Sequence, residues 1–359
     1  MTTIDVIGGG PAGAMAAIAA RHDGAEVRVF EKSAFPRHKV CGEFLSPGIL
    51  TLLRRAGCEQ EFLSLRPAAI RTMDLHFGSR LVRHALPEPA YGLSRYALDR
   101  LLLDKAAALG AEVVRETRTP RALERPLVLA NGRTAPDRTG ERLFGFKAHF
   151  RGGSVACGHA NEGALATAGT PEVFQQPTGV DDTVALFFFD GCYVGVSGVE
   201  SAEINVCGLA PERLLRDCAF QPERLLERCQ PLQSRLAGLE RVFDWLTTGP
   251  LVLGLPPREA PATLTYPAGD ALGFIDPFTG SGILNAMLCG YSAGEAAARR
   301  LPVDAYLAAG RRALRRPFLV SALFRQVIGT GLAGPLAALV PGSWLFHLTR
   351  PVGRAWARE

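Results

Sequence analysis

The stretch that decides the fold lies near the N-terminus and reads Ile4-Asp5-Val6-Ile7-Gly8-Gly9-Gly10-Pro11-Ala12-Gly13-Ala14-Met15-Ala16-Ala17-Ile18-Ala19-Ala20. A short apolar run, a glycine-rich turn and a run of small helix-forming residues predict a strand, a tight turn and a helix. Gly8 permits the turn, Gly10 lets the backbone approach a pyrophosphate, and Gly13 lets helix and strand touch. The amides that open such a helix favour a bound anion.

A second predicted strand, Glu26-Val27-Arg28-Val29-Phe30, ends in Glu31. This acid lies about 20 residues beyond the glycine turn, where a carboxylate accepts hydrogen bonds from ribose hydroxyls in dinucleotide-binding units. A glycine-rich turn without a nucleotide would need neither the flanking elements nor the acid. The N-terminal segment therefore predicts a Rossmann-type dinucleotide site.

The C-terminal half adds Tyr266-Pro267-Ala268-Gly269-Asp270-Ala271, followed by Asp276-Pro277-Phe278-Thr279-Gly280-Ser281-Gly282-Ile283, a glycine-rich turn that opens another helix. The arrangement resembles the FAD-dependent oxidoreductases that include para-hydroxybenzoate hydroxylase, geranylgeranyl reductases and flavin-dependent halogenases. The resemblance implies FAD as cofactor, Asp270 on the ribityl hydroxyls and the turn at 277–282 beside the isoalloxazine. Amides that start the helix at Ile283 would stabilise negative charge on the reduced ring.

Two further segments agree with this resemblance. Pro36-Arg37-His38-Lys39-Val40-Cys41-Gly42-Glu43 resembles the stretch that passes along the flavin in the reductase-like branch, and Leu93-Ser94-Arg95-Tyr96-Ala97-Leu98-Asp99 resembles the start of a helix whose Arg95 contacts the cofactor. Glu43 is the candidate catalytic acid or base, with Cys41 beside it. The candidate cofactor-binding residues are Gly8, Gly10, Pro11, Ala12, Gly13, Glu31, Lys32, Arg37, Lys39, Cys41, Gly42, Arg95, Gly132, Gly269, Asp270, Pro277, Gly280, Ser281, Gly282 and Ile283.

One departure concerns the electron donor. Hydroxylases of this group carry an Asp-Gly pair where this chain reads Asn131-Gly132, and the stretch from Val114 to Leu127 is short for the usual three-stranded meander. No second Gly-x-Gly-x-x-Gly unit follows a strand, which argues against a separate NAD(P)H domain. We expect NAD(P)H to dock transiently or a partner flavin reductase to supply electrons.

Between the two FAD segments the pattern turns β-like, with apolar alternation near a period of two. Asp190-Gly191 between two apolar runs indicates a hairpin. We expect an antiparallel sheet that roofs the flavin. The strands are expected at 144–150, 184–189, 193–196 and 204–209, and Phe187, Phe189, Tyr193 and Val196 either line the substrate cavity or pack in the core.

Composition excludes several classes. A formal charge of +5 over 359 residues gives little support for nucleic-acid binding. The eight Cys show no close pairs, so we expect no bound metal and reduced thiols. We also expect a cytoplasmic protein without a leader. Lys147 and His149, two apart in a predicted strand, share a face. Because an unpaired buried Lys is rare, we expect Lys147 to be solvated.

The predicted fold class is α/β, with a Rossmann-type parallel-sheet FAD domain, an α+β part built on an antiparallel substrate sheet, and C-terminal helices. The tail alternates apolar segments with Arg311, Arg312, Arg315 and Arg316, and no run is long enough to span a membrane. It either caps the FAD domain or forms a basic amphipathic surface peripheral to a membrane. The expected domains are FAD-binding at 1–65, 93–140 and 260–310, substrate-binding at 66–92 and 141–259, and the tail at 311–359.

The resemblance implies an FAD-dependent monooxygenase of secondary metabolism, which hydroxylates a hydrophobic aromatic or polyketide-like small molecule with O₂ through a flavin C4a-hydroperoxide. The first alternative is a geranylgeranyl-reductase-like enzyme that reduces an alkene, favoured by Cys41-Gly42. The second is a flavin-dependent halogenase, although the Trp-x-Trp segment of that branch is absent. Outside enzymes, a flavin-binding sensor remains open.

Overall fold

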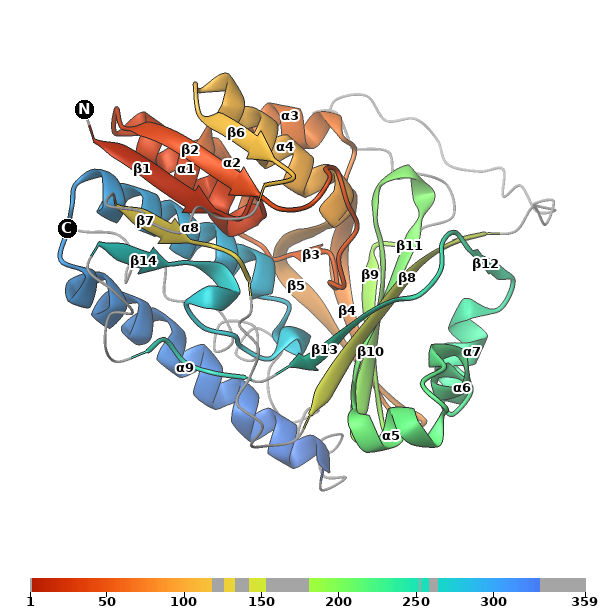
Figure 1. Ribbon diagram of the computed structural model, residues 1–359. Coiled ribbons are helices and arrows are strands. Elements are labelled where there is room, and N and C mark those ends of the chain that lie inside the picture. The colour runs from red at the N-terminus through yellow and green to blue at the C-terminus, as the bar shows by residue number, and fades with distance from the viewer. Residues whose placement is uncertain are drawn as a thin grey trace.

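The structure is a computed structural model that describes residues 2–117, 126–132, 142–152, 181–251, 253–257 and 264–329. Within these ranges the chain forms two sheets that lie side by side, one with helices over its face and one with helices at its far side (Figure 1). The predicted combination of a parallel sheet with a second, largely antiparallel sheet is confirmed.

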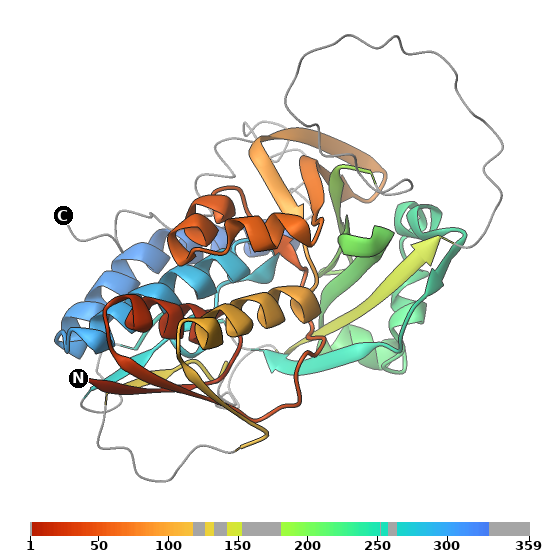
Figure 2. The ribbon, with the colours of Figure 1, turned by 90° about the horizontal axis from the view of Figure 1, so that it is seen from above.

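The first sheet is entirely parallel, in the order β14-β7-β1-β2-β6. Its central strand β1 is almost wholly buried, as expected for a parallel strand covered on both faces. Figure 2 shows helices α1, α4 and α8 on one side of this sheet. The strands are β1 (Thr3–Ile7), β2 (Glu26–Glu31), β6 (Glu112–Arg115), β7 (Leu127–Leu129) and β14 (Thr265–Pro267), and the helices are α1 (Pro11–His22), α4 (Arg95–Ala108) and α8 (Gly282–Ala298).

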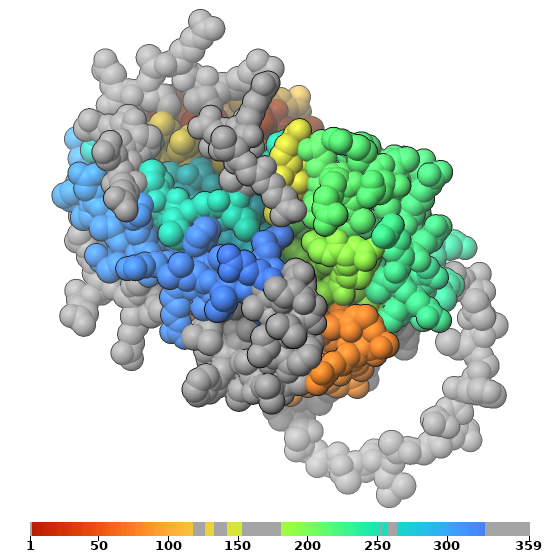
Figure 3. All heavy atoms as spheres, turned by 90° about the horizontal axis from the view of Figure 1, so that it is seen from below, coloured from red at the N-terminus to blue at the C-terminus, as the bar shows by residue number. Residues whose placement is uncertain are grey.

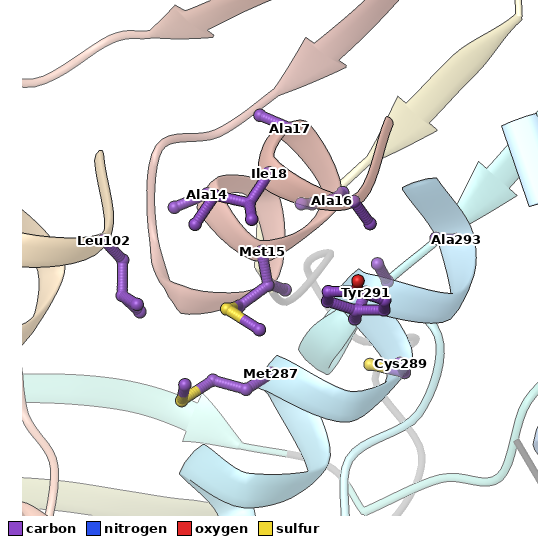
Figure 4. Close-up of a cluster of buried hydrophobic side chains, with 14 of the residues drawn as sticks. Ala14, Met15, Ala16, Ala17, Ile18, Leu102, Met287, Cys289, Tyr291 and Ala293 are labelled. Carbon is purple, nitrogen blue, oxygen red and sulfur yellow. The ribbon is translucent and has the colours of Figure 1, made fainter. Parts of the chain in front are cut away.

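Helices α1 and α8 pack unusually closely, which holds the two glycine-rich halves of the sequence together. A Cβ atom at Gly290 would lie 2.1 Å from the carbonyl oxygen of Ala12, and one at Gly294 would lie 2.1 Å from that of Ala16. In Figure 4, Met15 of α1 points toward Met287 of α8. Only glycine allows this approach. The glycines of α8 therefore set the position of α1, the helix that follows the N-terminal glycine turn.

The second sheet has the order β12-β8-β11-β10-β9-β4-β5-β3, with β13 paired to β8. All its described pairs are antiparallel except β4 with β9, which run parallel. An antiparallel sheet was expected, and the sheet found is mixed. Between β4 and β9 the chain passes through strands of the first sheet, and such a long connection permits parallel pairing. The strands are β3 (Phe44–Leu45), β4 (Ala68–Phe77), β5 (Arg80–Gly92), β8 (Leu143–Gly152), β9 (Thr183–Phe189), β10 (Cys192–Gly198), β11 (Ile204–Pro211), β12 (Leu239–Arg241) and β13 (Leu246–Leu251).

The hairpin between β9 and β10 forms where Asp190-Gly191 predicted it. Both residues adopt positive φ, 48° and 78°. Two consecutive left-handed residues give the turn whose twist matches that of paired strands.

The two faces of this sheet have different partners. Short helices α5 (Glu212–Asp217), α6 (Pro222–Leu226) and α7 (Gln230–Leu236) cover the outer face, and Phe187 and Val196 are buried in the core beneath them, with Phe189 packed at its margin. Tyr193 lies on the opposite, inner face, where it packs with Phe278. Of the four candidate cavity residues, Tyr193 alone therefore faces the first domain.

The remaining helices complete the first domain. Helix α9 (Val303–Gly329) extends from it to the end of the second sheet, where Phe324 stacks on Phe278 with ring centroids 4.8 Å apart (Figure 1). Figure 3 shows α9 on the surface next to the strands of that sheet. In the described ranges, none of the helices has both the length and the apolar character required to cross a bilayer. The shorter helices are α2 (Ile49–Ala56) and α3 (Glu59–Ser64), with 3-10 turns η1 (Glu200–Ala202), η2 (Gly269–Ala271) and η3 (Pro277–Thr279).

Candidate functional site

The glycine turn between β1 and α1 has the close approaches that its sequence predicted. Gly8 has φ +102°, and a Cβ there would lie 2.3 Å from the carbonyl oxygen of Ala130. A Cβ at Gly13 would lie 1.8 Å from the carbonyl oxygen of Gly8. Gly10 caps α1 without a side-chain hydrogen bond, and the first turn of the helix contains no acidic residue. The first amides of α1 are therefore available to an anion.

Glu31 lies at the end of β2, buried against this turn. Its carboxylate accepts a hydrogen bond from the Gly9 amide at 2.8 Å and another from the Ser33 amide at 2.9 Å. Burial raises the pKa of Glu31, but Arg37 and the two amides outweigh it and lower the pKa below its ordinary value. Glu31 is therefore a carboxylate at neutral pH. Lys32, the next residue, is exposed.

A guanidinium that is 12% exposed lies beside the turn. The Arg95 guanidinium lies 3.5 Å from the position of a Cβ on Gly10. Asp99 holds it in a bidentate pair, at 2.6 and 2.8 Å, and also pairs with Arg37 at 3.3 Å. Asp99 thus positions both arginines, and Arg37 also pairs with Glu31 at 3.2 Å. Helix α4, which carries Arg95 and Asp99, is capped by the hydroxyl of Ser94.

The C-terminal glycine segments approach the same helix. Gly269 has φ +63°, and a Cβ there would lie 2.9 Å from the Cβ of Ala12. The exposed Asp270 follows it in η2. Turn η3 begins at the half-buried Pro277 and is capped at its end by Gly280, which has φ +65°. Pro11, Ala12, Ser281 and Ile283 are buried, whereas Gly282 is exposed.

Segment 41–46 connects the η3 turn to strand β11 of the second sheet. The Ser46 hydroxyl donates to the carbonyl oxygen of Gly280 at 2.6 Å, and Asn205 of β11 donates to the carbonyl oxygen of Cys41 at 3.1 Å. Cys41 is half-buried, and Lys39 and Gly42 are exposed. The candidate residues of this segment therefore lie between turn η3 and the inner face of the second sheet. Gly132, three residues beyond β7, has φ +80°, and a Cβ there would meet nothing within 4 Å.

Glu43 is the centre of a buried network that joins helix α4 to strand β8 of the second sheet. Its carboxylate accepts hydrogen bonds from Lys147, from His149 Nε2 at 2.6 Å and from the Arg95 amide at 2.6 Å. Burial raises the pKa of Glu43, but the hydrogen bond from His149 and the charge of Lys147 outweigh it, so the pKa is lowered overall. Glu43 is thus a fully buried carboxylate with three donors.

The expectation that Lys147 is solvated is wrong. Its side chain is 0% exposed and ion-paired with Glu43. The premise that a buried Lys needs a partner holds, but the partner lies 104 residues earlier in the chain. The polar positions at 147 and 149 within an otherwise apolar strand were the signal for this network, and Glu203, Asn205, Asp276 and Arg325 were not singled out at all.

The network continues to the surface. His149 Nδ1 lies 2.8 Å from the Glu203 carboxylate, and Arg151 pairs with the other oxygen of Glu203 at 2.6 Å. His38 lies against the His149 ring, with centroids 5.2 Å apart. Ligand atoms of His38, Glu43 and His149 lie within 4.8 Å of one another, a spacing that a metal ion could bridge. Lys147 already neutralises the same carboxylate, which makes this an unfavourable position for a dication.

The residues fit FAD on observations of the structure itself. The turn at 8–13 leaves backbone amides and an arginine facing one place, which suits a pyrophosphate. Near the start of α8, the side-chain oxygen of Asn285 is buried and, within the described residues, lacks a hydrogen-bond partner. Such an atom indicates a ligand group that completes the site.

Comparisons with known proteins agree with this geometry. Residues 1–126 match the family described as an FAD binding domain. The flavin-dependent halogenase armH2 of Armillaria mellea is 36% identical over 124 residues, which span 33% of this chain and 24% of the relative. The match thus spans about a quarter of that relative's length.

Two solved structures have the same fold over nearly the whole chain. The flavin-dependent brominase Bmp2 superposes with a TM-score of 0.73 at 17% identity, covering 99% of this chain and 96% of its own. The flavin-dependent halogenase CmlS superposes with a TM-score of 0.69 at 20% identity, covering 98% of this chain and 68% of its own. At these identities the likeness establishes the fold. Together with the family match, it identifies FAD as the cofactor.

Proposed function

We propose that this chain, which belongs to the superfamily of FAD-dependent oxidoreductases and flavin-dependent halogenases, halogenates an apolar, electron-rich aromatic small molecule. The observation that carries the proposal is the identity of 36% with a flavin-dependent halogenase over 124 residues. The fold shared with a brominase along the whole chain supports it. Hydroxylation, which the sequence alone favoured, becomes the second candidate.

FAD would be held by the two glycine segments and the residues between them. The amides of the turn at 8–13 and Arg95 would bind the pyrophosphate, Glu31 the adenosine ribose and Asp270 the ribityl chain. Turn η3 and the start of α8 would lie beside the ring, with segment 39–43 passing along it. When bound and reduced, FAD supplies the two electrons that O₂ accepts.

Halogenation differs from hydroxylation in its proton balance. One substrate R–H, one halide ion, one O₂, FADH₂ and one proton give R–X, FAD and two waters, whereas hydroxylation of R–H by O₂ and FADH₂ gives R–OH, FAD and one water. Halogenation therefore consumes one additional proton per turnover. The described residues offer a buried set of proton-carrying groups, Glu43, Lys147 and His149, at the face where the ring would lie.

An apolar substrate suits the inner face of the second sheet. Phe188 and Tyr193 of the sheet meet Phe278 of η3 and Phe324 of α9, with neighbouring ring centroids 4.8 to 6.4 Å apart. Aromatic rings in edge-to-face and stacked arrangements would receive a further aromatic ring by the same interactions. We assign the substrate side of the ring to this cluster.

The second candidate, hydroxylation, is favoured by the absence of the Trp-x-Trp segment from the sequence. Reduction of an alkene would require neither halide nor O₂. In each case a partner flavin reductase, or transiently docked NAD(P)H, would supply the electrons, since the sequence contains a single Gly-x-Gly-x-x-Gly unit after a strand.

The test is to supply the FAD-loaded protein with a flavin reductase, NADH, O₂ and an electron-rich phenol or pyrrole, with chloride, with bromide or without halide. We expect a product whose mass carries the halogen and which requires both halide and O₂. An oxygenated product formed equally without halide would support hydroxylation. A saturated product from an isoprenoid alkene under anaerobic conditions would support reduction.

We also propose that helix α9 contacts a membrane surface. Arg312, Arg315 and Arg316 of α9 are exposed, and Leu319 and Leu323 follow them at 54% and 63% exposure. Arg311 differs, because it donates to the carbonyl oxygen of Pro256. Sedimentation with anionic liposomes at low salt would test the surface, since basic residues near a bilayer are attracted to anionic lipid.

A further inference from the structure

A line of polar side chains crosses the inner face of the second sheet. Lys147, His149 and Arg151 occupy alternate positions of β8, so their side chains share one face. Each is separated from the next by about 7 Å along the strand. On β11, Cys207 pairs with Lys147 and Asn205 pairs with His149.

The contacts along this line form a continuous chain from solvent to the interior. Glu203 is 17% exposed and contacts His149 Nδ1 at 2.8 Å. The opposite ring nitrogen of His149 contacts Glu43 at 2.6 Å, and the other oxygen of Glu43 binds Lys147. His149, Glu43 and Lys147 are 1% exposed or less.

The inner end of this chain lies toward the turn assigned to the flavin ring. In the next row of the sheet, Gly145 pairs with Leu209 and Leu209 with Tyr193, whose ring lies 6.2 Å from that of Phe278 in η3. An ammonium has three donors. Among the described residues, Glu43 is the partner that binds Lys147.

The groups have the chemistry that proton transfer requires. Glu43 is held as a carboxylate by His149 and Lys147, which lower its pKa despite burial. An imidazole between two carboxylates can take up a proton on one nitrogen while releasing one from the other. The other titratable or charged groups that face this chain are Cys41, Cys207, His38, Arg95 and Arg151.

We propose that Glu203, His149, Glu43 and Lys147 form a proton path between solvent and the flavin face of the second sheet. A proton enters at Glu203, crosses the His149 ring, reaches Glu43 and is delivered by Lys147. The path adds a route for the proton to the proposed function. It depends on one part of that function, the reaction of reduced FAD with O₂ at this face. In that reaction the anionic reduced cofactor, O₂ and one proton give oxidised FAD and H₂O₂, so one proton must be supplied even without substrate.

The experiment uses FAD-loaded protein, reduced by light under anaerobic conditions and mixed with O₂ in the absence of halide and substrate. Flavin absorbance and proton uptake by an indicator dye are followed from pH 6 to pH 9, in H₂O and in D₂O. Glu203→Gln removes the entry group. Glu240→Gln, an exposed carboxylate on the neighbouring strand β12, removes the same charge outside the path.

We expect Glu203→Gln to slow reoxidation at pH 8 by about tenfold, with a smaller effect at pH 6, where protons are more abundant. Its FAD affinity and the behaviour of Glu240→Gln should match the wild type. His149→Ala should be slower still and partly rescued by added imidazole, which a purely structural role would not predict.

Rates of Glu203→Gln within twofold of the wild type at every pH, or failure of imidazole to restore any rate, would overturn the path. Stoichiometric metal in the purified protein would overturn it in favour of a site at His38, Glu43 and His149. Because the assay contains no halide, its result is independent of whether the protein halogenates.

Discussion

The glycine turn and the Glu43 network both place charged groups around the same site, but they differ in how far apart their residues lie in the sequence. Gly9 and Glu31, which meet at the turn, are 22 residues apart. Glu43 lies 104 residues from Lys147 and 106 from His149. The glycine turn belongs to one supersecondary unit, whose sequence pattern is local. The Glu43 network forms only when helix α4 and the second sheet pack together.

This comparison predicts the largest effect at Glu43. Glu43→Gln should destabilise the protein by about 3–5 kcal/mol at pH 7, because it leaves the buried Lys147 charge without a partner. Denaturant unfolding of the FAD-loaded protein measures the change. Adding Lys147→Met should recover much of the loss, since an apolar side chain of similar volume tolerates the same burial. A single-variant loss below about 1 kcal/mol would contradict the ion pair.

The same variant has a defined pH dependence. The folded-state pKa of Glu43 is lower than its ordinary value of 4.5, so its contribution is complete above about pH 4.5 and is lost as pH falls through the folded-state pKa. The stability difference between wild type and Glu43→Gln should therefore shrink toward low pH. A difference that grew on acidification would contradict the assignment.

The glycine turn should show the next largest effect. Gly13→Ala introduces a Cβ 1.8 Å from the carbonyl oxygen of Gly8, which forces α1 away from β1. We expect a loss of about 1–3 kcal/mol in unfolding free energy, together with poor FAD retention. Gly152→Ala is the matched control, since a Cβ there meets nothing within 4 Å. Equal stability of the two variants would mean that the turn is not packed as described.

A smaller effect is expected at Glu31, where the change alters cofactor contacts more than packing. Glu31→Gln should weaken FAD binding by about 1.5 kcal/mol, or roughly tenfold, because a charged acceptor is replaced by a neutral one. Isothermal titration of the apoprotein with FAD measures it. Unchanged affinity would remove Glu31 from the adenosine side, and an equal loss of apoprotein stability would make its role structural.

The difference between the regions also explains what the sequence could predict. The parallel sheet, the glycine turn at 8–13 and the Asp190-Gly191 hairpin follow from short-range patterns, and the structure has them. The burial of Lys147 could not be read in this way, because its partner belongs to another element and no local pattern pairs them. The parallel pairing of β4 with β9 was missed for the same reason, since strand order depends on tertiary packing.

The orientation of side chains on the second sheet shows the same limit of prediction from local sequence patterns. Alternation correctly placed Lys147 and His149 on one face, but it could not say whether that face meets solvent or the first domain. The contact between Asn205 and the carbonyl oxygen of Cys41 decides this, because it fixes segment 41–46 against the sheet. Likewise Arg325, late in α9, binds the buried Asp276 at 2.5 Å and ties the tail to turn η3.

The most direct test of the central claim is a single turnover of the reduced, FAD-loaded protein with ¹⁸O₂, bromide and an electron-rich phenol, followed by mass spectrometry of the product. The account predicts a brominated product without ¹⁸O, because both oxygen atoms end in water. Gly13→Ala, with its FAD site disrupted, should give neither bromination nor oxygenation. A product that carries ¹⁸O and no bromine would contradict the halogenase assignment and identify the protein as a monooxygenase.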